Sequence, residues 1–335
     1  MDTASNTKGH SATPAVARSN VLLGDIGATN ARFAELGDGR LGEMKSFKVA
    51  NFRTFEEVLE AFLDQRRSTP DFSHALLALA GPVEAGRCKL TNTSWIVDPL
   101  ELSRLLGFEV RIVNDFQAVA YSLPLLAPPD LRAMGGGKPQ EGAAKVALGP
   151  GSGLGIACLV ETAGGPFVIP SEGGHSTLAG NSQREDAIIG VLRERFRHAS
   201  AERAISGPGL ENIFQAIAKL DGRDPMATDA AEITRRALTR ECEVAYEALS
   251  TFCSLLGSFA GSVALTFGAR GGVYIAGGIA PRIVEFLAHS QFRARFESKG
   301  RFRHYLEQIP SSIIVHPAAA FLGLKTLAEQ PNNRG

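Results

Sequence analysis

The sequence lacks an excess of charge of either sign. Among its 335 residues, 35 Lys and Arg balance 35 Asp and Glu. A neutral chain has no long-range field that draws it to a nucleic-acid backbone or an anionic membrane, because such affinity rises with the number of phosphates neutralised. We therefore expect neither nucleic acid nor membrane as a partner.

Cysteine is also scarce, and its spacing excludes a common zinc framework. The four cysteines are Cys88, Cys158, Cys242 and Cys253, and no two of them form the C-x-x-C pair that builds half of such a site. We interpret them as small buried hydrophobic residues of a protein in the reducing cytoplasm.

Long apolar runs are rare. Residues 1–20 are rich in Ser, Thr, Asn and Ala and lack the apolar stretch of a secretory signal, so we expect a disordered tail. The segment from Ala248 to Ala269 has no charge and is long enough to span a membrane. Its Ser and Thr residues recur every fourth position on one stripe, which we interpret as a closely packed core helix.

Hydrophobic periodicity predicts alternating strands and helices in the first half of the chain. Two strand-like runs joined by a glycine-containing turn open it, and the later segments alternate in type. Such alternation predicts an α/β fold with a largely parallel sheet. The predicted strands are 21–27, 31–36, 47–50, 74–80 and 109–113, and the predicted helices are 54–67, 99–106 and 116–125.

A segment rich in Pro and Gly, 127–144, interrupts this pattern and predicts a linker or domain edge. Strands at 145–148 and 156–161 then flank a second glycine-rich turn, which repeats the opening unit. We therefore predict two α/β domains related by duplication, with a cleft between them. The later predicted elements are a helical stretch over 183–270, strands 272–279 and 313–316, and helices from 281 and 318. The predicted division is a tail over 1–20, a small domain over 21–126 that the C-terminal helix 317–330 completes, and a large domain over 127–316.

The first glycine-containing turn belongs to the motif GDIGATNAR, residues 24–32. Gly24, Gly27 and Ala28 have little or no side chain, so backbone N–H groups there could approach a phosphate closely. Asp25 adds a carboxylate that would favour a phosphate accompanied by Mg²⁺. The alternative is a hairpin turn in which Asp25 and Asn30 bond to their own backbone.

The second turn, GPGSGLG over 149–155, has a density of glycine that indicates close approach of the backbone to a ligand. It does not match the dinucleotide-binding pattern G-x-G-x-x-G, and a strand follows where that pattern requires a helix. No Walker A loop occurs, since the only Gly-Lys pair precedes Pro139. A third glycine pair, Gly277 and Gly278, either admits a flat purine or forms a tight strand-to-helix turn.

Polar side chains follow several predicted strands. Asn114 and Asp115 come at the carboxyl end of a strand, where ligands bind in open parallel sheets. Asp115 could accept a proton from a hydroxyl as a general base, although Asn and Asp are also preferred N-caps. Glu172 and His175 could hold neighbouring hydroxyls or form an ordinary polar turn. Glu202 by itself is typical of an exposed helix end.

Five motifs in fixed order resemble those of the bacterial glucokinases. They are GDIGATNAR, TNTSW (91–95), IVNDFQAVA (112–120), SEGGH (171–175) and SAERAISGPGLENIF (200–214). The resemblance extends from about residue 21 to residue 328. That family belongs to the superfamily of hexokinases, actin and Hsp70-type ATPases, which has two duplicated α/β domains of the ribonuclease H-like type. The resemblance implies a cytoplasmic, ATP-dependent hexose kinase that transfers a phosphoryl group from Mg-ATP to O6 of D-glucose.

The resemblance also implies a role for each matched position. Asp115 would be the catalytic base, and Asp25 would direct Mg²⁺. The implied glucose-binding residues are Asn114, Asp115, Glu172, His175 and Glu202. The implied ATP-binding residues are Gly24, Asp25, Ile26, Gly27, Ala28, Thr29, Gly151, Ser152, Gly153, Gly277 and Gly278. The chain has Ala28 where the family usually has glycine and Ser152 where it usually has threonine, so we expect altered ATP affinity and preserved chemistry.

Three other interpretations stay open. A kinase of the same superfamily could act on mannose, fructose or an amino sugar, or take its phosphoryl group from polyphosphate; SEGGH and SAER together favour glucose. A sugar-sensing regulator would need a DNA-binding segment, and the sequence has no helix-turn-helix pattern before Val21 and no Cys-rich zinc motif. A non-catalytic scaffold would leave Asp115 without a role. The oligomeric state also stays open, a homodimer included.

Overall fold

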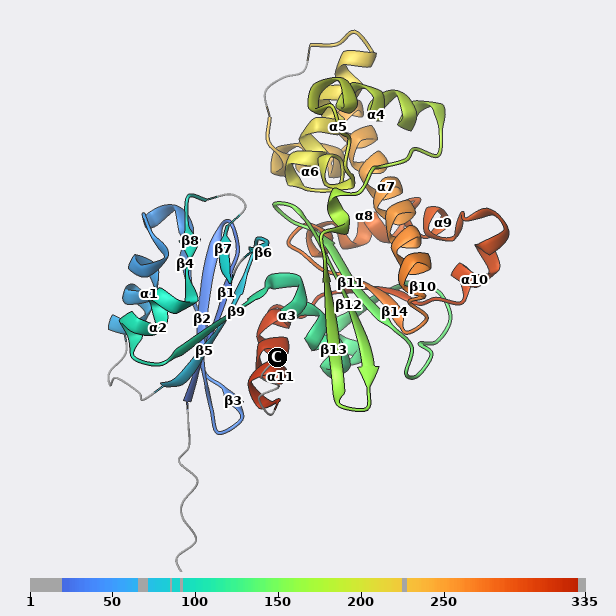
Figure 1. Cartoon of the computed structure of the whole chain (residues 1–335). Helices are drawn as coiled ribbons and strands as arrows, with labels where there is room; N and C mark the ends of the chain where they lie inside the picture. Colours follow the sequence, from blue (N-terminus) through green and yellow to red (C-terminus); the bar gives the residue numbers. More distant parts are fainter. Residues whose placement is uncertain (1–19, 66–71, 85, 91–92, 225–227, 331–335) are drawn as a thin grey trace, which may run out of the picture.

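The computed structural model describes residues 20–65, 72–84, 86–90, 93–224 and 228–330. Its described residues form two six-stranded sheets, with helices between the sheets and around them (Figure 1). The predicted tail lies outside the described residues, except for Asn20, which is the first residue of the first strand.

The first sheet combines an antiparallel hairpin with parallel strands. β1 pairs antiparallel with β2 and parallel with β5, and β5 pairs parallel with β9. The opening hairpin and the parallel strands after it are therefore as predicted. The strand order is β3 (Arg40–Leu41), β2 (Asn30–Gly37), β1 (Asn20–Ile26), β5 (Phe72–Leu79) and β9 (Glu109–Asn114), with β4 (Lys45–Lys48) also paired to β2.

The second sheet repeats this arrangement. β11 pairs antiparallel with β12 and parallel with β14, and β14 pairs parallel with β15. The order β12-β11-β14-β15 thus corresponds to β2-β1-β5-β9, which confirms the predicted duplication. The sheet order is β10 (Leu131–Gly135), β15 (Ser311–Ile314), β14 (Gly272–Ile275), β11 (Lys145–Pro150), β12 (Leu154–Thr162) and β13 (Gly165–Ser171). A small third sheet contains β6 (Val83–Glu84), β7 (Arg87–Lys89) and β8 (Ile96–Val97).

The helices begin where capping chemistry favours them. Thr54 accepts the Glu57 N–H ahead of α1, and Asp98 caps α2, which has Pro99 in its first turn. The α-helices are α1 (Phe55–Asp64), α2 (Pro99–Leu106), α3 (Asp115–Ser122), α4 (Gln183–Phe196), α5 (Gly207–Leu220), α6 (Ala230–Leu238), α7 (Glu243–Phe267), α8 (Val284–Ala288), α9 (Phe292–Glu297), α10 (Arg303–Glu307) and α11 (Ala319–Glu329). Residues 66 and 67 of the predicted first helix lie outside the described residues.

Two helices lie between the sheets, α3 and α11 (Figure 1). Each follows the third parallel strand of its own sheet, and α3 packs against β11–β13 whereas α11 packs against β1 and β5. Their backbones approach closely, because a Cβ on Gly323 of α11 would lie 1.7 Å from the Ala118 carbonyl oxygen of α3. At the start of α3, Phe116 fills the space that the missing side chain of Gly155 leaves.

The long uncharged segment forms the core helix α7. It is the one helix among the described residues with the length and hydropathy of a membrane span, and 72% of that window is buried inside the protein. Gly257 and Gly261 allow α9 to pack closely, since a Cβ at either position would lie within 2.3 Å of an α9 carbonyl oxygen. The segment is therefore a closely packed core helix, as predicted, and its two glycines allow the close contact.

Strands β10, β13 and β14 differ from the sequence prediction. The predicted linker 127–144 contains β10, an edge strand of the second sheet in which only Met134 is buried. β13 was not predicted; it is an edge strand that contains two prolines, which edges tolerate. β14 ends at Ile275 instead of Ile279, because Gly277 turns the chain with a φ of 82°.

The four cysteines are free thiols. Cys88, Cys158 and Cys253 are buried, as predicted, whereas Cys242 is half-buried at the N-cap of α7.

Candidate active site

The parallel strands β1, β5 and β9 end together at the carboxyl edge of the first sheet. Asp25 and Asn114 both lie at this edge. Ile26 of β1 is in register with Leu79 of β5, which is in register with Asn114 of β9. Strand spacing therefore places the first glycine-containing turn about 10 Å from the start of α3. Two motifs that are far apart in the sequence thus meet at the carboxyl edge.

Asp25 is buried at this edge and forms an ion pair with Arg32. The two residues are cross-strand partners in the β1–β2 hairpin. Arg32 also donates to the Pro317 carbonyl oxygen at 3.0 Å, just before α11. Burial raises the pKa of Asp25, while the Arg32 guanidinium opposes this rise. Sequence reasoning missed Arg32, although it belongs to the first motif.

Asp115 is the first residue of α3 and is half-buried. Burial raises the pKa of its carboxyl group to about 7, and the negative charges of Asp25 and Glu172 add to the rise. One carboxylate oxygen accepts the Phe116 N–H at 2.9 Å. A carboxylate with a pKa near neutrality is suited to exchange protons with a hydroxyl group.

Asn114 caps α3. Its side-chain oxygen accepts the N–H groups of Phe116 and Gln117 at 2.9 and 3.3 Å, and its amide donates to the Gly81 carbonyl oxygen. These contacts fix the first turn of the helix and with it the adjacent Asp115. In this structure Asn114 is therefore an N-cap, which is one of the roles that the sequence allows for it.

The second glycine-rich turn joins β11 to β12. Gly151, Ser152 and Gly153 form its tip, where the Gly151 N–H donates to the Gly153 carbonyl oxygen at 2.8 Å. Gly277 lies against the start of this turn, since a Cβ there would be 2.4 Å from the Pro150 carbonyl oxygen. The structure thus brings the second and third glycine motifs together, and Gly278 has open space around it.

Three polar residues from two segments, 172–175 and 200–203, lie near this turn. His175 Nε2 lies 3.8 Å from the Glu172 carboxylate, and His175 Nδ1 lies 4.0 Å from Glu202 Oε1. The side chains of Glu172 and His175 are 65% and 61% exposed, whereas that of Glu202 is only 22% exposed. The structure therefore brings these three side chains together, and Glu202 is less exposed than its sequence context suggests.

The glucokinase family model matches residues 22–331. The chain belongs to the glucokinase family. It is 41% identical over 305 residues to the glucokinase of Erwinia tasmaniensis, covering 90% of this chain and 94% of that one. Because this identity extends over nearly the whole of both chains, family membership applies to both sheets.

Solved structures show the same fold. A glucokinase from an Antarctic psychrotroph is 35% identical, with a TM-score of 0.79, and the match covers 92% of this chain and 98% of that chain. A ROK family glucokinase from Streptomyces griseus, solved with glucose and AMPPNP, has a TM-score of 0.61 at 16% identity, covering 93% and 100% of the two chains. The second likeness shows the fold alone, which is the predicted actin-like class.

Within this family member, the residues of the first turn serve different purposes. Gly24 lies inside β1, where a Cβ would be 2.7 Å from the Leu77 side chain, so its small size is required by packing. The turn itself begins at Gly27, whose N–H donates to the Asn30 carbonyl oxygen at 3.0 Å. Ile26 is buried, Ala28 is half-buried and Thr29 is exposed. The backbone of residues 27–29 is therefore the part of the motif that faces away from the sheet core.

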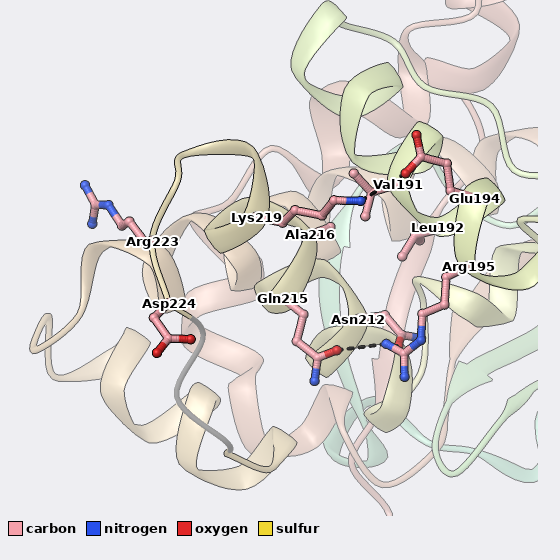
Figure 2. Close-up of a pocket in the computed structure, with 10 residues that line it drawn as sticks. All are labelled: Val191, Leu192, Glu194, Arg195, Asn212, Gln215, Ala216, Lys219, Arg223 and Asp224. Carbon is pink, nitrogen blue, oxygen red and sulfur yellow. Dashed lines mark hydrogen bonds and ion pairs between the residues drawn. The ribbon is translucent and has the colours of Figure 1, made fainter.

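A separate groove of about 730 Å³ lies between α4 and α5 (Figure 2). Arg195 bridges it by donating to Asn212 and Gln215 at 3.1 and 2.8 Å. None of the predicted site residues lines this groove. It is therefore distinct from the candidate active site.

Proposed function

We propose that this site transfers the γ-phosphoryl group of ATP to O6 of D-glucose, giving glucose 6-phosphate and ADP. The observation that carries the proposal is the position of Asp115. Its carboxyl group, with a pKa raised to about 7, belongs to the first residue of α3, and the next residue, Phe116, packs against Gly155 of β12, the strand that follows the second turn. A base here can take the proton from a hydroxyl that attacks a phosphoryl group held by both turns.

The sugar would be held by Asn114, Glu172, His175 and Glu202. Carboxylates accept hydrogen bonds from sugar hydroxyls, and an analogue that lacks one hydroxyl would leave a partly buried acceptor unpaired. Such contacts orient O6 toward Asp115. His175 lies 3.8 Å from the Glu172 carboxylate and 4.0 Å from Glu202 Oε1, beyond hydrogen-bond distance, which supports a role of these groups in hydrogen bonding to a shared ligand.

The nucleotide would lie across the two turns. Backbone N–H groups of residues 27–29 and 151–153 would hold the phosphates, and Gly277 and Gly278 would contact the adenosine. Asp25 fits a role in holding Mg²⁺, because it is a buried hard-oxygen donor, and Mg²⁺ commonly binds one or two carboxylates together with substrate phosphates. When bound, the ion would neutralise charge on the phosphates.

We also propose that residues 21–126 with the C-terminal helix 317–330 form one body and residues 127–316 a second. Asn114 and Asp115 belong to the first body, whereas Glu172, His175 and Glu202 belong to the second, so glucose would bridge the two. The enzyme would work in the cytoplasm, with no nucleic-acid or membrane partner.

The test is ADP release by the purified protein with Mg-ATP and glucose, together with identification of the phosphorylated sugar. We expect turnover of roughly 1 to 100 per second. Parallel assays with mannose, fructose, an amino sugar and polyphosphate test the alternative kinases. Full activity in excess EDTA would refute the role of Mg²⁺, and no ADP release with any sugar would favour a regulator or a scaffold.

A further inference from the structure

Glu202 contacts the second glycine-rich turn as well as the predicted sugar site. Its Oε2 accepts the backbone N–H of Leu154 at 3.0 Å, and Leu154 directly follows the Gly151–Gly153 tip. Its Oε1 lies on the side of His175, at 4.0 Å from Nδ1. The two oxygens of one carboxylate therefore serve two different regions. Sequence patterns do not predict this contact, because residues 154 and 202 are far apart in the chain.

Gly153 leaves the space that this contact requires. A Cβ on Gly153 would lie 2.6 Å from Glu202 Oε2, which is closer than non-bonded atoms approach. A methyl group at Gly153 would therefore displace the Glu202 carboxylate, so this glycine serves the contact as well as any approach of a phosphate.

The segment that holds Glu202 is itself fixed by hydrogen bonds. The Ser206 hydroxyl donates to the Glu202 carbonyl oxygen at 2.8 Å, and Asn212 donates to the Arg203 carbonyl oxygen at 2.9 Å. At the other end of the turn, the Gly207 N–H at the start of α5 donates to the Gly151 carbonyl oxygen at 2.8 Å. Residues 202–207 therefore hold the turn at both of its ends.

We infer that Glu202 is a positioning residue for the second phosphate turn, and that it links sugar binding to nucleotide binding. This inference rests on the proposed function. A hydroxyl bound to Oε1 would restrict rotation of the carboxylate, and through Oε2 it would restrict the turn. A turn held in place before the nucleotide arrives binds phosphate with less loss of conformational entropy.

The decisive measurement is the affinity for Mg-AMPPNP without sugar, because a residue that only binds sugar cannot change it. Loss of a charge-assisted hydrogen bond in Glu202→Ala should weaken this affinity about tenfold, and Glu202→Gln, which keeps an acceptor oxygen, should weaken it about threefold. His175→Ala is the matched control, since His175 lies on the sugar side of the same carboxylate. It should weaken glucose binding and leave sugar-free AMPPNP affinity unchanged.

Gly153→Ala gives the reciprocal test. It lies in the phosphate turn, yet it should weaken glucose binding without nucleotide by about three- to tenfold, because the new methyl group displaces the Glu202 carboxylate. Hydrogen exchange of the Leu154 amide should be faster in the variants of Glu202 and Gly153 and unchanged in His175→Ala. If Glu202→Ala does not fold, Glu202→Gln and Gly153→Ala still decide the question.

Wild-type AMPPNP affinity in the variants of Glu202, with unchanged exchange of Leu154, would overturn the inference. Unchanged glucose affinity in both Glu202→Ala and His175→Ala would instead refute the proposed sugar site. Failure of this inference and failure of the proposed function would therefore give different results.

Discussion

At the scale of single residues, Asp115 shows how position changes the acid–base behaviour of a carboxyl group. Its pKa of about 7 comes first from burial at the start of α3 and then from the charges of Asp25 and Glu172. An ordinary Asp with a pKa near 3.8 is a weaker base. The same burial opposes ionisation, so the group has consequences for both turnover and stability.

Replacement of Asp115 by Asn should lower turnover by about 10²- to 10⁴-fold, because the amide cannot accept the proton of O6. Glucose affinity should change much less, since the amide keeps a hydrogen-bonding group of similar shape. Steady-state kinetics measure the loss of turnover, and calorimetry measures the smaller change in glucose affinity. Near-normal turnover would exclude Asp115 as the base.

The same variant should be more stable than the wild type in alkaline buffer. The folded-state pKa of Asp115 is raised above 3.8, so its contribution to stability is present at low pH and is lost as the pH rises through about 7. Asn does not ionise, so the variant does not lose stability at this position as the pH rises. After allowance for partial exposure, the free energy of unfolding at pH 8 should increase on the order of 2 kcal/mol, and the difference should shrink toward pH 5. Thermal unfolding at the two pH values measures it.

The pH dependence of kcat/KM should fall on the acid side with an apparent pKa near 7, since protonated Asp115 cannot act as a base. Glu172→Gln removes one of the charges that raise this pKa, so its acid limb should move to lower pH even though its glucose KM increases. An acid limb that stays in place would show that Glu172 does not influence Asp115.

At the scale of elements, the packing of α3 against α11 determines where Asp115 lies. Gly323→Ala should force the two helices apart, because the added methyl group would meet the Ala118 carbonyl oxygen. We expect a loss of at least about 2 kcal/mol in the free energy of unfolding, with reduced turnover.

Gly190→Ala in α4 is the matched control, since a Cβ there meets nothing within 4 Å. This variant should gain about 0.5 to 1 kcal/mol. Chemical denaturation compares the two variants, and equal stability would show that the helix contact tolerates a methyl group.

Sequence reasoning predicted those elements that local chemistry determines. The opening hairpin, the Pro-initiated helix α2 and the repeated strand arrangement follow from alternation, capping and glycine turns. β10 was missed because its only buried side chain is Met134 and its partner β15 lies far along the chain.

The site was predicted in part. The motifs named its polar residues, but Arg32 and the contact of Glu202 with Leu154 depend on pairing between distant segments, which one sequence does not show. The small size of Gly24 has a packing reason, the Leu77 side chain of β5, that the sequence does not show.

At the scale of the whole molecule, the duplicated sheets place one glycine-rich turn in each half. Glucose bridging the two proposed bodies should favour a closed state, which would exclude water as a competing acceptor. We expect a smaller radius of gyration with saturating glucose in small-angle scattering, and slow ATP hydrolysis without sugar. Xylose, which lacks the 6-carbon arm, should bind weakly and raise that hydrolysis. An unchanged radius together with rapid sugar-free hydrolysis would show a rigid molecule.

The buried thiols have a practical consequence for observing such a motion. Burial raises the pKa of Cys88 and Cys158 to about 11 and that of Cys253 to about 12. Maleimides and iodoacetamides react with thiolates, so these three cysteines are poor targets at neutral pH. Replacing the half-buried Cys242 alone would leave a background for attaching a donor and an acceptor dye at two new cysteines, one on each sheet. Energy transfer between the dyes would then report domain separation in single molecules during turnover.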